Sequence, residues 1–156
     1  MPPIKRLPEL EGISREHHDG LLLCWKIRAG TAKGVAPARI QRYCRRFLKE
    51  HLKPHFDIEE SVLFPILGHE HPGVRKAMAE HRRLQRLING RSDAALAISL
   101  VEEELEAHIR FEERQLFNLI QEAATPGQLV EVEKAHALIH SSVAVKDVPD
   151  DVFWEQ

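Results

Sequence analysis

The fold is decided by two stretches, HFDIEESVLFPIL at residues 55–67 and HIRFEERQLFNLI at residues 108–120. In each stretch a histidine is followed four residues later by a glutamate, then by a second glutamate and a leucine–phenylalanine pair. Residues four apart lie on the same face of a helix, one turn above one another. Each stretch therefore predicts a helix that projects an imidazole and a carboxylate towards the core.

Helical periodicity continues along the rest of the chain. Ser14, Ser92 and Thr125 are the predicted N-caps, and Asn89-Gly90 is the predicted left-handed C-terminal cap. Pro54 falls inside the second helix, where an interior proline costs about 3 kcal/mol or more, so we expect one kinked helix there. The predicted helices cover residues 15–29, 38–67, 74–88, 93–123 and 126–140.

Four long helices joined by short loops predict an all-α, up-down-up-down four-helix bundle with a short additional C-terminal helix. We expect one domain over residues 1–140, followed by a tail over residues 141–156. The tail carries Phe153-Trp154, and it either docks on the bundle, binds a protein partner or stays loose.

The composition excludes several classes of protein. The 22 basic and 24 acidic residues give a net charge of −2, which argues against binding to nucleic acid or to an anionic membrane. No secretory signal or membrane-spanning stretch is evident. With two cysteines and no close pair, a disulfide framework is not expected, and we predict a cytoplasmic protein.

Two imidazole–carboxylate pairs in a bundle core predict bound cations. Buried carboxylates and imidazoles are costly unless they are paired, hydrogen-bonded or bound to metal. Mixed imidazole and carboxylate ligands favour iron or manganese, and the lack of a cysteine cluster disfavours a structural zinc site. Carboxylates on facing helices can bridge two ions.

The first and third helices each offer a histidine aligned with apolar residues. The first carries Glu16-His17-His18 and the third carries Glu80-His81. These helices are therefore expected to complete the metal site, with the choice between His17 and His18 left open.

Together the four motifs resemble the hemerythrin-like family, also called HHE cation-binding domains, over roughly residues 13–122. The resemblance implies a non-heme, carboxylate-bridged di-iron centre, with manganese or zinc as substitutes. It also implies that Glu59 and Glu112 bridge the two ions and that the histidines are terminal ligands. The ligands implied by the resemblance are His17, His55, Glu59, His81, His108 and Glu112.

One position departs from the pattern of the oxygen-carrying members. They have a second histidine four residues after the helix-three histidine, where this chain has Gln85. The resemblance then implies a more open coordination position, or a substitute ligand among His18, His51 and Glu16. Of the other histidines, His51 is expected to lie beyond the site, and the pair His136 and His140 to lie on a solvated face.

These observations favour a di-iron protein that binds or senses oxygen, reactive oxygen species or nitric oxide, with a diatomic or peroxide ligand at the metals. The alternatives are a peroxidase-like or nitric-oxide-handling enzyme, an iron donor or store for repair of iron centres, and a bundle that uses metal only to tie its helices together. Whether the protein is an enzyme stays open at this point.

Overall fold

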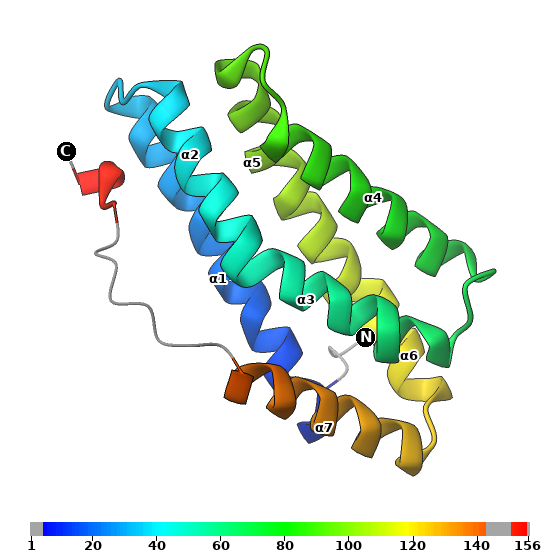
Figure 1. Cartoon of the computed structure of the whole chain (residues 1–156). Coiled ribbons are helices and arrows are strands. Elements are labelled where there is room, and N and C mark those ends of the chain that lie inside the picture. The colour runs from blue at the N-terminus through cyan, green and yellow to red at the C-terminus, as the bar shows by residue number, and fades with distance from the viewer. Residues whose placement is uncertain (1–4, 143–150, 156) are drawn as a thin grey trace.

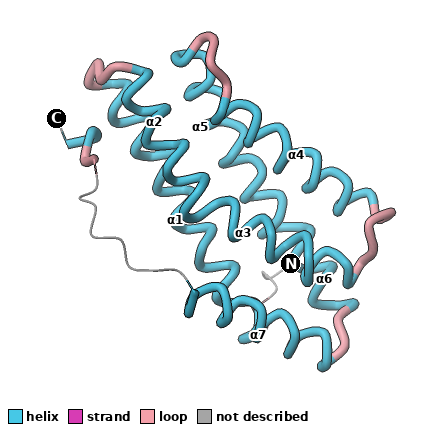
Figure 2. Tube along the Cα trace, in the orientation of Figure 1, coloured by secondary structure: helices cyan, strands magenta, loops and turns pink. Residues whose placement is uncertain are grey.

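A computed structural model of the protein describes residues 5–142 and 151–155, apart from the side chains of residues 140–142. Helices account for nearly all of this part of the chain, and it contains no strand (Figure 2). The predicted all-α class is therefore confirmed. None of the described helices is long and apolar enough to cross a membrane.

The first helix, α1 (Pro8–Ala32), begins earlier than predicted. Pro8 occupies the first helical turn, where its missing N–H costs nothing, and Glu9 and Glu11 face the positive end of the helix dipole. Ser14 therefore lies inside the helix and not at its N-cap, and its hydroxyl donates to Glu113. The proline-rich start of the chain is a helix-start signal that the N-cap prediction overlooked.

The second long helical stretch runs without a break from Pro37 to Ile66. It consists of α2 (Pro37–Phe47), a π-helical turn, α3 (Lys53–Ile58), a second π-helical turn at Glu59–Leu63, and a short 3-10 turn. In the first π-turn, at Leu48–Leu52, the Lys53 N–H donates to the Leu48 carbonyl five residues back. Because Pro54 has no N–H, this wider turn accommodates it without ending the helix.

The next helices are α4 (Pro72–Asn89) and α5 (Ala94–Phe111), and α5 continues through a π-turn into α6 (Phe117–Ala123). Two more of the predicted caps are wrong. Asp93 and not Ser92 caps α5, because its side chain accepts the Leu96 N–H. Gly90 has φ −62°, so α4 ends without a left-handed residue.

The last helix, α7 (Pro126–Ser142), begins at the predicted Thr125 cap. The Thr125 hydroxyl accepts the Gln128 N–H, while the Gln128 side chain accepts the Thr125 N–H. Figure 1 shows α7 lying across the end of the bundle where α1 begins, and it packs against α1 and α3.

At the other end of α1, a 3-10 turn at Phe153–Glu155 docks on the bundle. Phe153 is fully buried against Tyr43 and over Gly30, where an added Cβ would lie 2.6 Å from the Phe153 ring. The described end of the predicted tail is therefore docked, while residues 143–150 lie outside the described part of the chain.

The apolar core consists of two clusters that lie on either side of a polar layer. Leu52, Phe56, Leu105 and Ile109 belong to the first cluster. The second contains Leu63, Phe64, Leu116 and Phe117. The histidines and glutamates of the two motifs stand between these residues in the sequence, so the fold places them in a layer between the two apolar clusters.

Candidate metal centre

The six residues predicted as ligands are all buried, with at most 5% of each side chain exposed. They come from all four long helical stretches, because His17 lies on α1 and His81 on α4. His55 and His108 lie on α3 and α5, and each precedes its glutamate by one turn. The structure thus brings together residues that are up to 95 positions apart in the chain.

These side chains form two groups that share both glutamates. In each group, one atom from every residue lies within 4.8 Å of the others, close enough to hold a metal ion. The first group is His17, His55, Glu59 and Glu112, and the second is Glu59, His81, His108 and Glu112.

The two groups are related by an approximate two-fold symmetry. His17 Nε2 lies 3.0 Å from Glu112 Oε1, and His81 Nε2 lies 3.0 Å from Glu59 Oε1. His55 Nε2 to Glu59 and His108 Nε2 to Glu112 are both 3.3 Å. Exchanging the pair α1 and α3 with the pair α4 and α5 therefore reproduces the same set of distances.

Each shared glutamate begins a π-helical turn. The Phe64 N–H donates to the Glu59 carbonyl and the Phe117 N–H to the Glu112 carbonyl, each five residues back. The wider turn adds one residue to the helix, and as a result both side chains of the leucine–phenylalanine pair that ends it are fully buried. Such turns occur frequently at functional sites, and here they occupy equivalent positions in the two halves.

A second set of glutamates surrounds the histidines. The Nδ1 atom of every histidine in the centre lies within hydrogen-bond distance of a carboxylate from a neighbouring helix. The pairs are His17 with Glu113 at 2.9 Å, His55 with Glu16 at 3.1 Å, His81 with Glu60 at 2.7 Å, and His108 with Glu80 at 2.8 Å. A carboxylate that accepts the Nδ1 proton fixes the tautomer and aims the Nε2 lone pair inwards, which is the usual support for a metal-bound imidazole.

This outer ring of glutamates was missed from the sequence, although a signal was present. Each of its members directly adjoins a residue of the centre, as in Glu16-His17 and Glu59-Glu60. What the sequence did not reveal is that each of these carboxylates supports the histidine of another helix.

Most of the inward-facing atoms lack hydrogen-bond partners, the exceptions being His17 Nε2 and Glu112 Oε1, which pair with each other at 3.0 Å. Six buried side-chain atoms have none: His55 Nε2, His81 Nε2, His108 Nε2, both Glu59 oxygens and Glu112 Oε2. Several of them lie 3.0–3.3 Å from an opposite group without the geometry of a hydrogen bond, because they converge on shared points and do not point at one another. Buried polar atoms without partners are costly, and cations at these points would satisfy them. The residues present therefore fit a pair of metal ions.

Protonation balances the buried carboxylates when no metal is bound. Burial alone lowers the pKa of His55 and His81, but the neighbouring glutamates outweigh it and raise these pKa values to about 9 and about 11. The pKa values of His17 and His108 are raised for the same reason. Burial and the charge of Glu112 raise the pKa of Glu59, but the histidines lower it to about 2. Metal binding at neutral pH must therefore displace protons from imidazoles.

The structure also distinguishes between His17 and His18 and locates the candidate substitutes for a ligand at Gln85. His18 is exposed and outside both groups, whereas His17 belongs to the first. Gln85 and its suggested substitutes His18, His51 and Glu16 lie outside both groups. Glu16 instead supports His55.

His136 was expected on a solvated face and is instead only 18% exposed, with Nε2 3.2 Å from Glu16. The side chain of its predicted companion, His140, lies outside the described residues. Cys24 and Cys44 are buried in the apolar core and belong to neither group.

One comparison with known proteins gives a match. A family model described as the hemerythrin HHE cation binding domain matches residues 9–97, more than half of the chain. The matched region contains His17, His55, Glu59 and His81, and it ends before the second His-x-x-x-Glu motif. No curated protein and no solved structure matches the chain.

Proposed function

Because the chain belongs to the hemerythrin HHE cation-binding domain family, we propose that it holds two iron ions, bridged by Glu59 and Glu112, in an up-down-up-down four-helix bundle. His17 and His55 would hold one ion, and His81 and His108 the other. Residues 1–140 would form this metal-binding domain, and the protein would act in the cytoplasm.

The observation that carries this proposal is the convergence of unpartnered imidazole and carboxylate atoms on two points that share both glutamates. Imidazole with carboxylate suits iron, and also manganese or zinc as substitutes, better than it suits calcium or magnesium. Each of the two groups offers two imidazoles and both shared carboxylates. This equal supply of ligands favours two ions, one in each group.

We further propose that the centre binds or senses oxygen, peroxide or nitric oxide and does not transport dioxygen. Bound iron supplies redox change and free coordination positions for such ligands. With Gln85 outside the centre, each ion has four donor residues from the chain, which leaves positions for an external ligand. The outer glutamates hold the imidazoles in place, and Phe56, stacked on His81 with ring centroids 3.8 Å apart, keeps water from that side.

A peroxidase-like or nitric-oxide-handling enzyme is the second candidate, because a hollow described below reaches three of the four histidines. An iron donor is less well supported. A donor must release its metal readily, whereas these histidines are buried and each is tied to an outer carboxylate.

The test is metal analysis of the purified protein together with optical spectra taken before and after exposure to dioxygen, hydrogen peroxide and nitric oxide. We expect about two iron ions per chain and a spectrum that changes with at least one of the three ligands. Fewer than about one transition-metal ion per chain after anaerobic iron loading would contradict the di-iron proposal.

A further inference from the structure

The two-fold symmetry of the centre does not extend to the side chains that cover it. Gly20 stands three residues after His17, and its equivalent three residues after His81 is Leu84. Ile109 follows His108, and its equivalent Phe56 follows His55. The side of the centre between α1 and α5 is therefore covered by glycine and isoleucine, and the side between α3 and α4 by the larger leucine and phenylalanine.

The side with the larger residues is densely covered. Leu84 and Phe56 are each 1% exposed and belong to the same apolar cluster. The Phe56 ring stacks on His81, and Phe64 covers His81 with ring centroids 5.6 Å apart.

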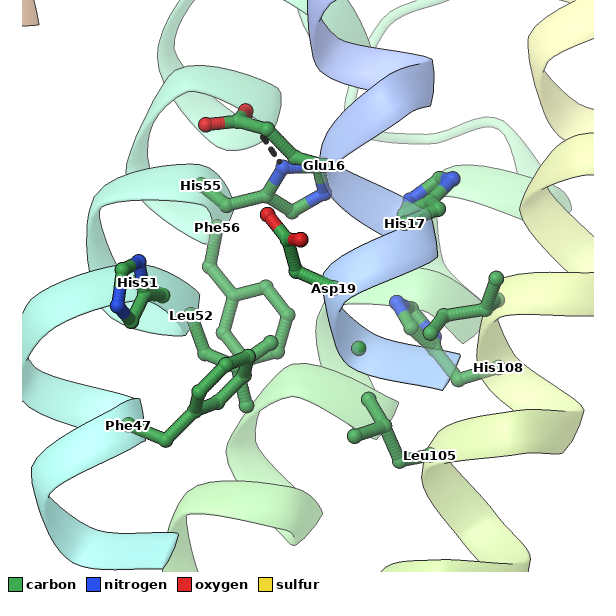
Figure 3. A pocket seen from close by; sticks show the side chains of 12 residues that line it. Glu16, His17, Asp19, Phe47, His51, Leu52, His55, Phe56, Leu105 and His108 are labelled. Carbon is green, nitrogen blue, oxygen red and sulfur yellow. Dashed lines mark hydrogen bonds and ion pairs between the residues drawn. The ribbon is translucent and has the colours of Figure 1, made fainter. Parts of the chain in front are cut away.

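The side with the smaller residues contains a hollow, shown in Figure 3. Gly20 and Ile109 line it, together with Leu52, Leu105 and Phe56, and the imidazoles of His17, His55 and His108 form its inner wall. The centre of a water molecule has about 20 Å³ of room there, which is enough for a water-sized molecule. A Cβ at Gly20 would lie 2.7 Å from Ile109 Cδ1, so any larger residue would push into this space.

The rim of the hollow also differs from the position equivalent to it by the two-fold symmetry. Asp19 and His51 stand at the mouth of the hollow, and their equivalents are Arg83 and Glu104. Arg83 Nε and Glu104 lie 3.1 Å apart and close that position with an ion pair. No such pair joins Asp19 and His51 among the residues that the structure describes, and the His51 ring rests against Phe47 instead.

We propose that the hollow beside Gly20 is the access route and binding position for the small ligand, which reaches the centre from the side between α1 and α5, where His17, His55 and His108 line the hollow. This inference rests on the proposed function. The size of the hollow selects molecules not much larger than water, and Asp19 at its mouth with Glu16 in its wall favours uncharged ones over anions. Dioxygen, hydrogen peroxide and nitric oxide meet both conditions. Gly20 is then the residue that determines access, because its missing side chain keeps the route open.

The test uses nitric oxide as the probe, mixed anaerobically with the reduced, iron-loaded protein, and follows the rate of the optical change. Gly20→Leu copies the equivalent residue Leu84 and should slow this rate by about tenfold or more. His18→Leu adds the same side chain on the exposed side of the same helix and should leave the rate unchanged. Circular dichroism and iron content establish that each variant is folded and loaded.

Two further variants keep the test decisive if Gly20→Leu does not fold. Gly20→Ala should slow nitric oxide binding to a smaller extent, and Ile109→Ala, which widens the hollow, should speed it. The double variant Gly20→Ala with Ile109→Ala should bind nitric oxide at a rate closer to that of the wild type than Gly20→Ala alone. Crystals of the metal-free wild type should also show a water molecule in the hollow that Gly20→Ala displaces.

The outcomes separate this inference from the proposed function. If the Gly20 variants bind nitric oxide at the wild-type rate with full iron content, the access route is elsewhere and the di-iron proposal stands. If the wild-type protein takes up no iron, the proposed function itself fails, and the access route fails with it.

Discussion

Glu16 Oε1 lies between two histidines, 3.1 Å from His55 Nδ1 and 3.2 Å from His136 Nε2. The contact joins α7, which lies across the end of the bundle, to the first half of the candidate centre. His136 also packs on Gly12, where an added Cβ would lie 2.6 Å from the imidazole. Helix α7 therefore contributes to the candidate centre as well as to the core, because His136 contacts a carboxylate that orients a histidine of the centre.

Glu16→Ala should weaken metal binding in one half only. Loss of a carboxylate that supports a metal-bound imidazole costs about 10–100-fold in affinity, and we expect that loss for one of the two ions in a chelator titration. Glu80→Ala is the matched variant, because it removes the equivalent support from His108 in the other half. His136→Ala should have a smaller effect that resembles Glu16→Ala. Equal weakening of both ions by Glu16→Ala would contradict the division into halves.

Replacing either shared glutamate by alanine should remove the two-metal spectrum. Glu59 and Glu112 each belong to both groups, so the loss of one carboxylate disturbs both positions. Asp57→Ala serves as the control, since Asp57 is exposed and pairs with Lys53 at the surface of the same helix. Metal content and the optical spectrum are the measurements. Retention of the two-metal spectrum in both variants would show that the bridging assignment is wrong.

The stability of the metal-free protein should have an optimum in mildly acidic solution. The pKa of His55 is raised from 6.5 to about 9 and that of His81 to about 11, so their stabilising contribution is complete below pH 6.5 and lost as the pH rises through these values. The pKa of Glu59 is lowered from 4.5 to about 2, so its contribution is complete above pH 4.5 and lost as the pH falls. We expect the highest free energy of unfolding between about pH 4.5 and 6.5.

Bound metal should abolish the decline in the free energy of unfolding on the alkaline side of this optimum. Bound imidazoles are neutral, so the four histidines of the loaded centre no longer change charge in this range, and urea titrations from pH 6 to 9 should show stability that no longer declines. A metal-free protein whose stability rises steadily over the same range would contradict the assigned protonation. Metal affinity itself should fall in acid, because protons then compete for the imidazoles.

Phe153→Ala should destabilise the bundle without changing its metal content. Burial of a phenylalanine side chain is lost together with its packing, and such changes cost about 3–5 kcal/mol. Gly30→Ala should act in the same direction, because its Cβ would lie 2.6 Å from the Phe153 ring. Thermal unfolding of the loaded protein measures both effects. Unchanged melting temperatures in both variants would mean that the docked segment contributes nothing to stability.

The all-α class and the six candidate metal ligands could be predicted from the sequence, because residues four apart must share a helix face. The structure brings these six side chains together. The sequence did not reveal which carboxylate supports which imidazole. His108 and Glu80 are 28 residues apart, and His17 and Glu113 are 96 apart. Such pairings depend on how the helices are arranged, and no local pattern contains that information.

Helix boundaries were less predictable for a different reason. Ser14 and Asp93 are both good capping residues, yet only Asp93 is used, since the proline and acidic residues before Ser14 start α1 seven residues earlier. The π-turns at Glu59 and Glu112 were not predicted either. One extra residue in a turn leaves the sequence period almost unchanged, and it becomes visible only in the backbone hydrogen bonds.

The outer glutamates form a closed circuit. Glu16 on α1 supports His55, and Glu60, just after α3, supports His81 on α4. Glu80 on α4 in turn supports His108 on α5, and Glu113 beyond α5 supports His17 on α1, which completes the circuit.

No helix in this circuit can be omitted without releasing an imidazole in another. A chain that has docked only two or three helices therefore has no finished position for either ion, and a newly made protein would acquire metal only as its last helix settles. Metal uptake would then mark the end of folding, and half-folded chains would carry no loosely bound metal ion.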